Sequence, residues 1–183
     1  MTPLGMMVAG LGLVVADLRF NGFDVIPDLL GWAVVLGGLA RLVGRSPWLA
    51  AAAVAASCGV VLGLPLLLAE PGPLVSAAEG VVLAVLIFGT CTGIRDVVTS
   101  ERTRDTANRI RWTGLVLYLV ALPANLFAGP TEVTGPAAFG VVVVVVAVLA
   151  YFAWFLVFLW SNRSDPALGA QRGVPTRPGP LGA

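Results

Sequence analysis

The residues of this chain that could do chemistry are acidic and lie close to its N-terminus. The stretch DLRFNGFDVIPD, residues 17–28, places three aspartates and an asparagine between two long apolar runs. These four residues, Asp17, Asn21, Asp24 and Asp28, are spaced four, three and four apart, which would align them on one face of a helix. Carboxylate and amide oxygens are the ligands that hard cations prefer. The stretch is therefore a candidate site for a cation or a cationic substrate, with the identity of any metal left open.

The same stretch also has a purely structural interpretation. Asn21-Gly22 is a turn signal, because both residues tolerate positive φ angles. Asp24 is suited to cap the helix that follows, with Pro27 in its first turn, and Asp28 would lie one turn further on, near the positive end of the helix dipole. Gly22 and Pro27 would also interrupt a continuous helix through the four polar residues. A cation site and a turn followed by a capped helix both stay open.

Further polar features fall at matching places in the other apolar runs. Glu79 lies one turn into the fourth run, and Pro65 and Pro123 interrupt the third and the fifth, with Asn125 beside the second of them. Prolines within a membrane leave backbone carbonyls that protein or a wet cavity must satisfy. With the aspartates, these residues predict an acidic vestibule at one end of the molecule.

The composition defines the class of protein that must carry this vestibule. The 183 residues are 58% hydrophobic and 11% charged, whereas soluble domains are about 45–50% apolar and about 25% charged. The chain has no histidine, which excludes Ser-His-Asp and Cys-His catalysis and histidine-based zinc sites within it. We find no acid–base–nucleophile set, no phosphate-binding glycine loop and no basic patch for nucleic acid, so an enzyme is not favoured and no cofactor is expected.

The apolar runs predict an all-α fold, a bundle of six transmembrane helices that forms one domain over residues 1–160 and is followed by a disordered cytoplasmic tail, 161–183. A helix needs about 20 apolar residues to cross the hydrocarbon core. We expect spans at about 3–18, 25–43, 47–69, 75–94, 112–128 and 137–160.

The arginines predict the orientation of this bundle. Cytoplasmic segments of membrane proteins carry an excess of Lys and Arg. With both termini inside, ten of the eleven basic residues fall on the cytoplasmic side, and only Arg19 falls outside. Trp48, Trp112 and Trp160 then lie at inner boundaries, where aromatic rings prefer to sit. The expected location is the cell membrane, with the lipid bilayer as the first partner.

Two motifs of the opening stretch resemble known families. The run FDVIPDLLGW, from Phe23 to Trp32, resembles the F-D-x-x-P-D-x-x-G-aromatic segment of small uncharacterised multi-pass bacterial membrane proteins. That resemblance implies a bacterial membrane setting and no particular activity. Asn21, Asp24 and Asp28 partly resemble the N-D-x-x-D-x-x-x-D motif of intramembrane prenyltransferases, which bind Mg²⁺. The asparagine spacing differs and a second aspartate-rich motif is missing, so we do not adopt this reading.

Small residues predict how the helices pack. Gly59 and Gly63, and again Gly89 and Gly93, are spaced four apart, the pattern that lets membrane helices approach closely. We expect these glycines to pack helices within the bundle, with a face for a second copy or a membrane partner protein as the alternative.

Three function classes follow from the sequence. The first is a small transporter or channel-like protein whose outer acids, Asp17, Asp24, Asp28 and Glu79, attract a cation. The second is a structural or accessory subunit that packs against a partner. The third, which is less favoured, is a membrane-embedded enzyme acting on lipid or polyprenyl substrates. The sequence names no cargo and no partner.

Overall fold

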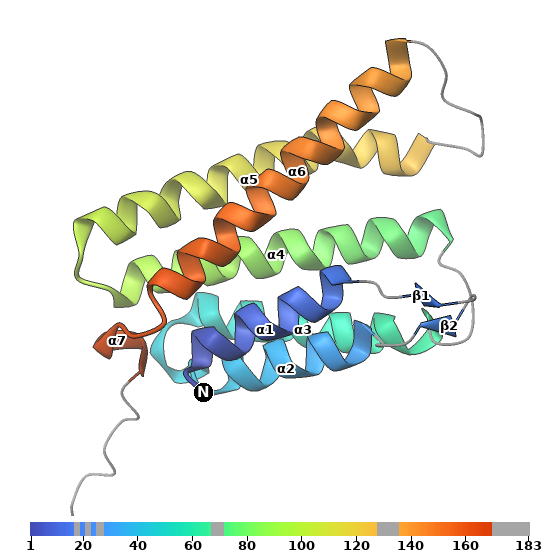
Figure 1. The fold of residues 1–183 in the computed structure, drawn as a ribbon. Helices are drawn as coiled ribbons and strands as arrows, with labels where there is room; N and C mark the ends of the chain where they lie inside the picture. The colour runs from blue at the N-terminus through green and yellow to red at the C-terminus, as the bar shows by residue number, and fades with distance from the viewer. Residues whose placement is uncertain (17–18, 21–22, 25–27, 67–71, 128–135, 170–183) are drawn as a thin grey trace, which may run out of the picture.

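The chain folds into a bundle of helices with one short hairpin (Figure 1). The computed structural model describes residues 1–16, 19–20, 23–24, 28–66, 72–127 and 136–169. The long helices are α1 (Pro3–Ala16), α2 (Asp28–Ala40), α3 (Pro47–Leu66), α4 (Pro73–Val97), α5 (Glu101–Phe127) and α6 (Pro136–Ser161). Between and after them lie strands β1 (Arg19–Phe20) and β2 (Phe23–Asp24), a 3-10 turn η1 (Val43–Arg45) and the short helix α7 (Pro166–Gly169). The predicted helical class is confirmed.

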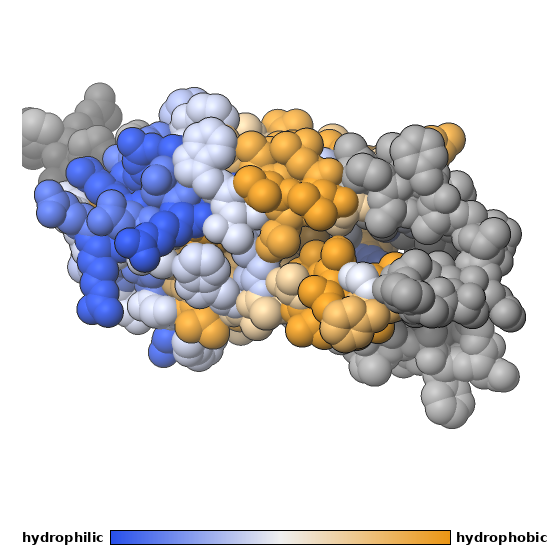
Figure 2. All heavy atoms as spheres, turned by 90° about the horizontal axis from the view of Figure 1, so that it is seen from above, coloured by the Kyte–Doolittle hydropathy of each residue, from blue (hydrophilic) through white to orange (hydrophobic). Residues whose placement is uncertain are grey.

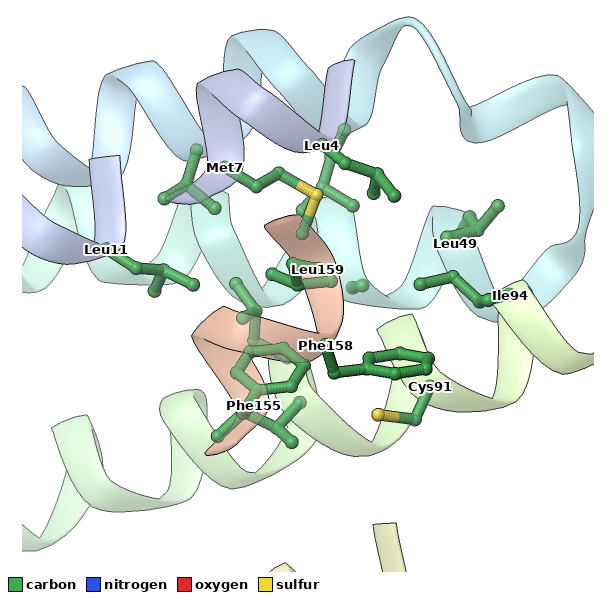
Figure 3. Close-up of a cluster of buried hydrophobic side chains, with 14 of the residues drawn as sticks. Leu4, Met7, Leu11, Leu49, Cys91, Ile94, Phe155, Phe158 and Leu159 are labelled. Carbon is green, nitrogen blue, oxygen red and sulfur yellow. The ribbon is translucent and has the colours of Figure 1, made fainter. Parts of the chain in front are cut away.

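The helices pack in the order of the chain. α1 lies against α2, α2 against α3, α3 against α4 and α4 against α5. The last long helix, α6, crosses this layer obliquely and contacts both α1 and α5 (Figure 1). Its C-terminal half closes one core with the N-terminal helices, as the buried side chains of Leu4, Met7, Phe155, Phe158 and Leu159 show (Figure 3).

Glycines bring the first two helices into backbone contact. A Cβ added to Gly10 on α1 would lie 2.6 Å from the carbonyl oxygen of Gly31 on α2, and a Cβ added to Gly31 would lie 2.8 Å from that of Gly10. Gly38 meets the carbonyl oxygen of Pro3 at 2.7 Å in the same way. Only hydrogen fits at these crossing points, so α1 and α2 form a tight pair.

The four glycines singled out in the sequence pack α3 against its two neighbours. Gly59 faces the buried ring of Trp32 on α2, and Gly63 faces the backbone of Leu29. Gly89 and Gly93 on α4 face the first two turns of α3. These glycine faces are therefore occupied inside the bundle and are not available to a partner protein.

The opening stretch differs from its helical interpretation. Arg19 pairs with Asp24 and Phe20 with Phe23 in an antiparallel register, so β1 and β2 form a hairpin. The described part of α2 begins at Asp28, while Asp24, the expected cap of this helix, lies in β2. Alternation of apolar and polar residues on either side of a turn signal favours a strand pair over one more helical turn.

Two polar segments are more ordered than their composition predicted. The expected loop before residue 112 is helical from Glu101 onward, because Glu at a helix start and Arg and Ala along it favour helix even outside the membrane. The expected tail, 161–183, still forms α7, and Leu168 is 1% exposed within the core. Arg45 holds this segment by donating to the carbonyl of Ala167. Residues 170–183 lie outside the described part of the chain.

The surface of the bundle carries many large apolar side chains. Among the described residues, two helical stretches are long and apolar enough to cross a membrane, Leu74–Val97 in α4 and Phe139–Ser161 in α6. Of their most apolar windows only 28% and 22% is buried inside the protein, whereas a core helix of a soluble protein would be mostly buried. Figure 2 shows a hydrophobic band beside a hydrophilic end. That end holds α7, the N-terminus and the α4–α5 connection (Figure 1).

Candidate functional site

The first two turns of α2 and α4, which carry two acids of the predicted vestibule, lie at the end of the bundle opposite the hydrophilic one (Figure 1). Asp17 and Asn21 fall outside the described residues. Of Asp24 the structure describes the backbone in β2. Asp28 opens α2 and Glu79 lies in the second turn of α4, and both are half-buried.

The glycine contacts place these two described acids at one level of the bundle. Gly63 on α3 lies beside Leu29, the neighbour of Asp28. Gly89 on α4 lies beside Ala52 of α3. Because the two helices are antiparallel, ten residues back from Gly89 along α4 and ten residues forward from Ala52 along α3 lead to the same level. Glu79 therefore lies level with residue 62. At about 1.5 Å per residue this level is roughly 22 Å from Trp48 along α3.

A charged carboxylate at that level has an energetic cost if the bundle lies in a membrane. In the predicted topology Trp48 marks the inner boundary, so a point about 22 Å away would fall inside a hydrocarbon core about 30 Å thick. One carboxylate oxygen of Asp28, Oδ1, is shielded from solvent by the protein. Acids at such depth usually mark an ion or substrate path. In the described part of the chain, no three acidic or thiol groups converge closely enough to hold a metal ion.

A groove of about 390 Å³ runs along the surface formed by α3, α4 and α5. Its walls are almost wholly apolar, and four of its residues, Trp48, Val81, Val85 and Trp112, are exposed. The lining consists of Trp48, Ala51, Val81, Ala84, Val85, Phe88, Gly89, Trp112, Leu115 and Tyr118. At the end of the groove that faces the hydrophilic end of the bundle, three rings meet edge to face. The ring centroids of Trp48 and Phe88 are 6.0 Å apart, and those of Phe88 and Trp112 are 5.9 Å apart.

Arg111 lies beside that end of the groove, behind the rings that line it, and itself lines a small neighbouring cavity of about 30 Å³. The central carbon of its guanidinium is 5.5 Å from the ring centroid of Phe88 and 5.4 Å from that of Trp112. Its Nη1 donates a hydrogen bond of 3.3 Å to Oγ1 of Thr92, which itself donates to the carbonyl of Phe88 at 2.8 Å. Nε of Arg111 is buried and has no hydrogen-bond partner among the residues described.

Sequence reasoning missed this groove although one signal was available. It identified Trp48, Trp112 and Trp160 as interfacial rings, and the structure leaves each about half exposed, at 44%, 50% and 51%. Arg111, the neighbour of Trp112, was counted only among the arginines that predict the orientation. A cation next to an interfacial tryptophan at the start of an apolar run was the signal that could have drawn attention to a binding site.

Comparison with known proteins adds no relative. No protein-family model, no curated protein and no solved structure matches the chain.

Proposed function

We propose that the chain is a six-span integral membrane protein of the cell membrane, with both termini in the cytoplasm. The observation that supports this proposal most is the distribution of side chains on the surface. Valine-rich helix faces are exposed next to an end that is rich in arginine. α4 has 25 residues and α6 has 26, lengths of about 37–39 Å that exceed the hydrocarbon thickness. α1 and α2, with 14 and 13 residues, reach only about 20 Å.

Cysteine labelling tests the orientation. In a Cys58→Ala, Cys91→Ala background, Gly72→Cys and Thr99→Cys each introduce one thiol at an exposed position on opposite ends of α4. We expect a membrane-impermeant maleimide to label residue 72 in intact cells and residue 99 only after permeabilisation. Labelling of both from one side would contradict a membrane-spanning α4, and the reverse pattern would contradict the assigned orientation.

Within this topology, a small transporter or channel-like protein with an acidic outer vestibule is the function that the acids support best. Asp28 and Glu79 reach one level from two different helices, at a depth where acids usually face the interior of the bundle or a water-filled cavity. Their carboxylate oxygens are the ligands that a hard cation prefers. The resemblance of residues 23–32 to bacterial multi-pass proteins is in keeping with this proposal.

Cation binding is expected to stabilise the folded protein. A cation at 100 times its dissociation constant adds about 2.7 kcal/mol to the folded state. We expect Na⁺, Mg²⁺, Ca²⁺ or Mn²⁺, titrated at constant ionic strength, to raise the melting temperature in detergent. Asp28→Asn and Glu79→Gln should each abolish the rise. Glu101→Gln, an exposed acid at the other end, is the matched control and should keep it. Equal response of all three variants would refute the vestibule.

A structural or accessory subunit is the second candidate, and one observation favours it. In the outer half of α6, successive valines are exposed, among them Val141, Val142 and Val143. Because Gly59 and Gly89 already pack inside the bundle, a partner protein or a second copy would have to use this valine face of α6 instead.

A further inference from the structure

The groove beside Arg111 is long enough for part of a lipid chain. From Val81 to Gly89 along α4 it extends over eight residues, or about 12 Å. The opposite wall runs from Tyr118 back to Trp112 on α5 over a similar length. Only apolar atoms and ring faces line most of this length, so the groove offers dispersion contacts to a hydrocarbon chain and nothing to a hydrated solute.

The end of the groove beside Arg111 is charged, in contrast to its apolar walls. Arg111 lies one turn closer to the hydrophilic end than Phe88, at the level of Thr92. Among the described residues no carboxylate pairs with its guanidinium, and its charge is held by two ring faces and one hydroxyl. Ring faces stabilise a cation by about 0.5–2 kcal/mol but do not neutralise it. Nε is buried and has no hydrogen-bond partner among the described residues, so an acceptor from outside the protein would meet the guanidinium at its terminal nitrogens.

A phosphodiester supplies what this arrangement lacks. Arginine presents a planar fork of donors that matches phosphate oxygens, and the phosphates of the inner leaflet lie at the level of the interfacial tryptophans. We propose that the groove binds one acyl chain of an inner-leaflet glycerophospholipid, whose phosphate contacts Arg111. This inference rests on the membrane orientation proposed above, but it is independent of the cation vestibule at the other end.

The test compares lipids with the same chains in the purified full-length protein. Dioleoyl phosphatidylglycerol is expected to raise the melting temperature in detergent in a saturable way, and dioleoylglycerol, which lacks the phosphate, should require about tenfold more lipid for the same rise. Inorganic phosphate alone should give no rise. Arg111→Gln should weaken the response to phosphatidylglycerol about tenfold and bring it to the level of dioleoylglycerol.

Two further variants make the result decisive. Arg163→Gln is the matched control, because Arg163 also stacks on an interfacial ring, 3.9 Å from the centroid of Trp160, away from the groove; it should respond like the wild type. Val85→Trp fills the groove from an exposed position and should weaken the response about tenfold while leaving Arg111 intact. Equal responses to both lipids, a rise with inorganic phosphate, or a wild-type response in Val85→Trp would overturn the inference.

Failure of this inference can be told apart from failure of the topology. The maleimide pattern at residues 72 and 99, repeated in the Arg111→Gln protein, reports whether α4 crosses the membrane. A correct pattern without lipid selectivity refutes the lipid site alone, and an incorrect pattern refutes the membrane orientation on which it depends.

Discussion

Replacing Gly59 by leucine is expected to destabilise the bundle by about 3 kcal/mol. A Cβ at this position would lie 2.4 Å from Cδ2 of Trp32 and 2.7 Å from two further ring atoms. Trp32 is 2% exposed, so its ring has no vacant space into which to move. The contact is one of those that join α3 to α2, and a shift here would also move Gly63 away from Leu29. Unfolding by sodium dodecyl sulfate in mixed micelles, followed by circular dichroism, measures the loss.

A double-mutant cycle separates this steric cause from a general effect of leucine. Trp32→Ala alone should cost about 3–5 kcal/mol, because it leaves a cavity. The two substitutions combined should cost less than their sum, with a coupling of about 1–3 kcal/mol, since the leucine fills the space that the ring vacates. Strict additivity would show that Gly59 and Trp32 do not share the contact that the structure gives them.

The second large effect is expected at the crossing of α1 and α2. Gly10→Ala adds a single methyl group, but it would lie 2.6 Å from the carbonyl oxygen of Gly31 and 2.8 Å from the backbone nitrogen of Val35. Backbone atoms cannot rotate away, so the helices must separate. We expect a loss of about 2–3 kcal/mol in the free energy of unfolding, measured by the same unfolding titration.

Gly12→Ala is the matched control for this prediction. Gly12 lies on the same helix only two residues away, and its added Cβ would meet nothing within 4 Å. Alanine is favoured over glycine within a helix by about 0.5–1 kcal/mol, so this variant should be unchanged or slightly more stable. If both alanine variants behaved alike, the close approach of α1 and α2 would be wrong.

Hydropathy was sufficient to predict where the six long helices lie, because long apolar runs are compatible with few structures other than a helix. It was a poor guide to where they end. Residues 101–111 are polar and were assigned to a loop, but helix propensity and a glutamate in the first turn extend α5 through them. The helix therefore continues beyond the apolar run, which hydropathy alone cannot reveal.

Packing partners were harder to predict than helices. Spacing of four identified Gly59 with Gly63 and Gly89 with Gly93, because each pair lies on one helix. Gly10 and Gly31 lie on different helices, and their importance becomes visible only where α1 and α2 cross. No local sequence pattern therefore identifies them. The segment FDVIPDLLGW is an instructive case, since its Gly31 and Trp32 both make close contacts between helices.

The candidate site could be predicted only in part for a related reason. The acids at the outer end stand out by charge, and their residue types suggested a cation. The groove at the other end is built from residues that are ordinary in a membrane helix, and its interest arises from three helices that place Trp48, Phe88 and Arg111 together. Convergence of this kind depends on the tertiary fold.

The position of Leu168 has a consequence for biogenesis. This side chain is buried in the core, yet it follows α6 in the chain and is held there by the contact between Arg45 and Ala167. During synthesis the earlier helices can pair as they leave the ribosome, but this end of the core stays open until α6 and α7 have been made and the chain has turned back. Quality control that senses an unclosed core would therefore respond to nascent chains that stall after α6.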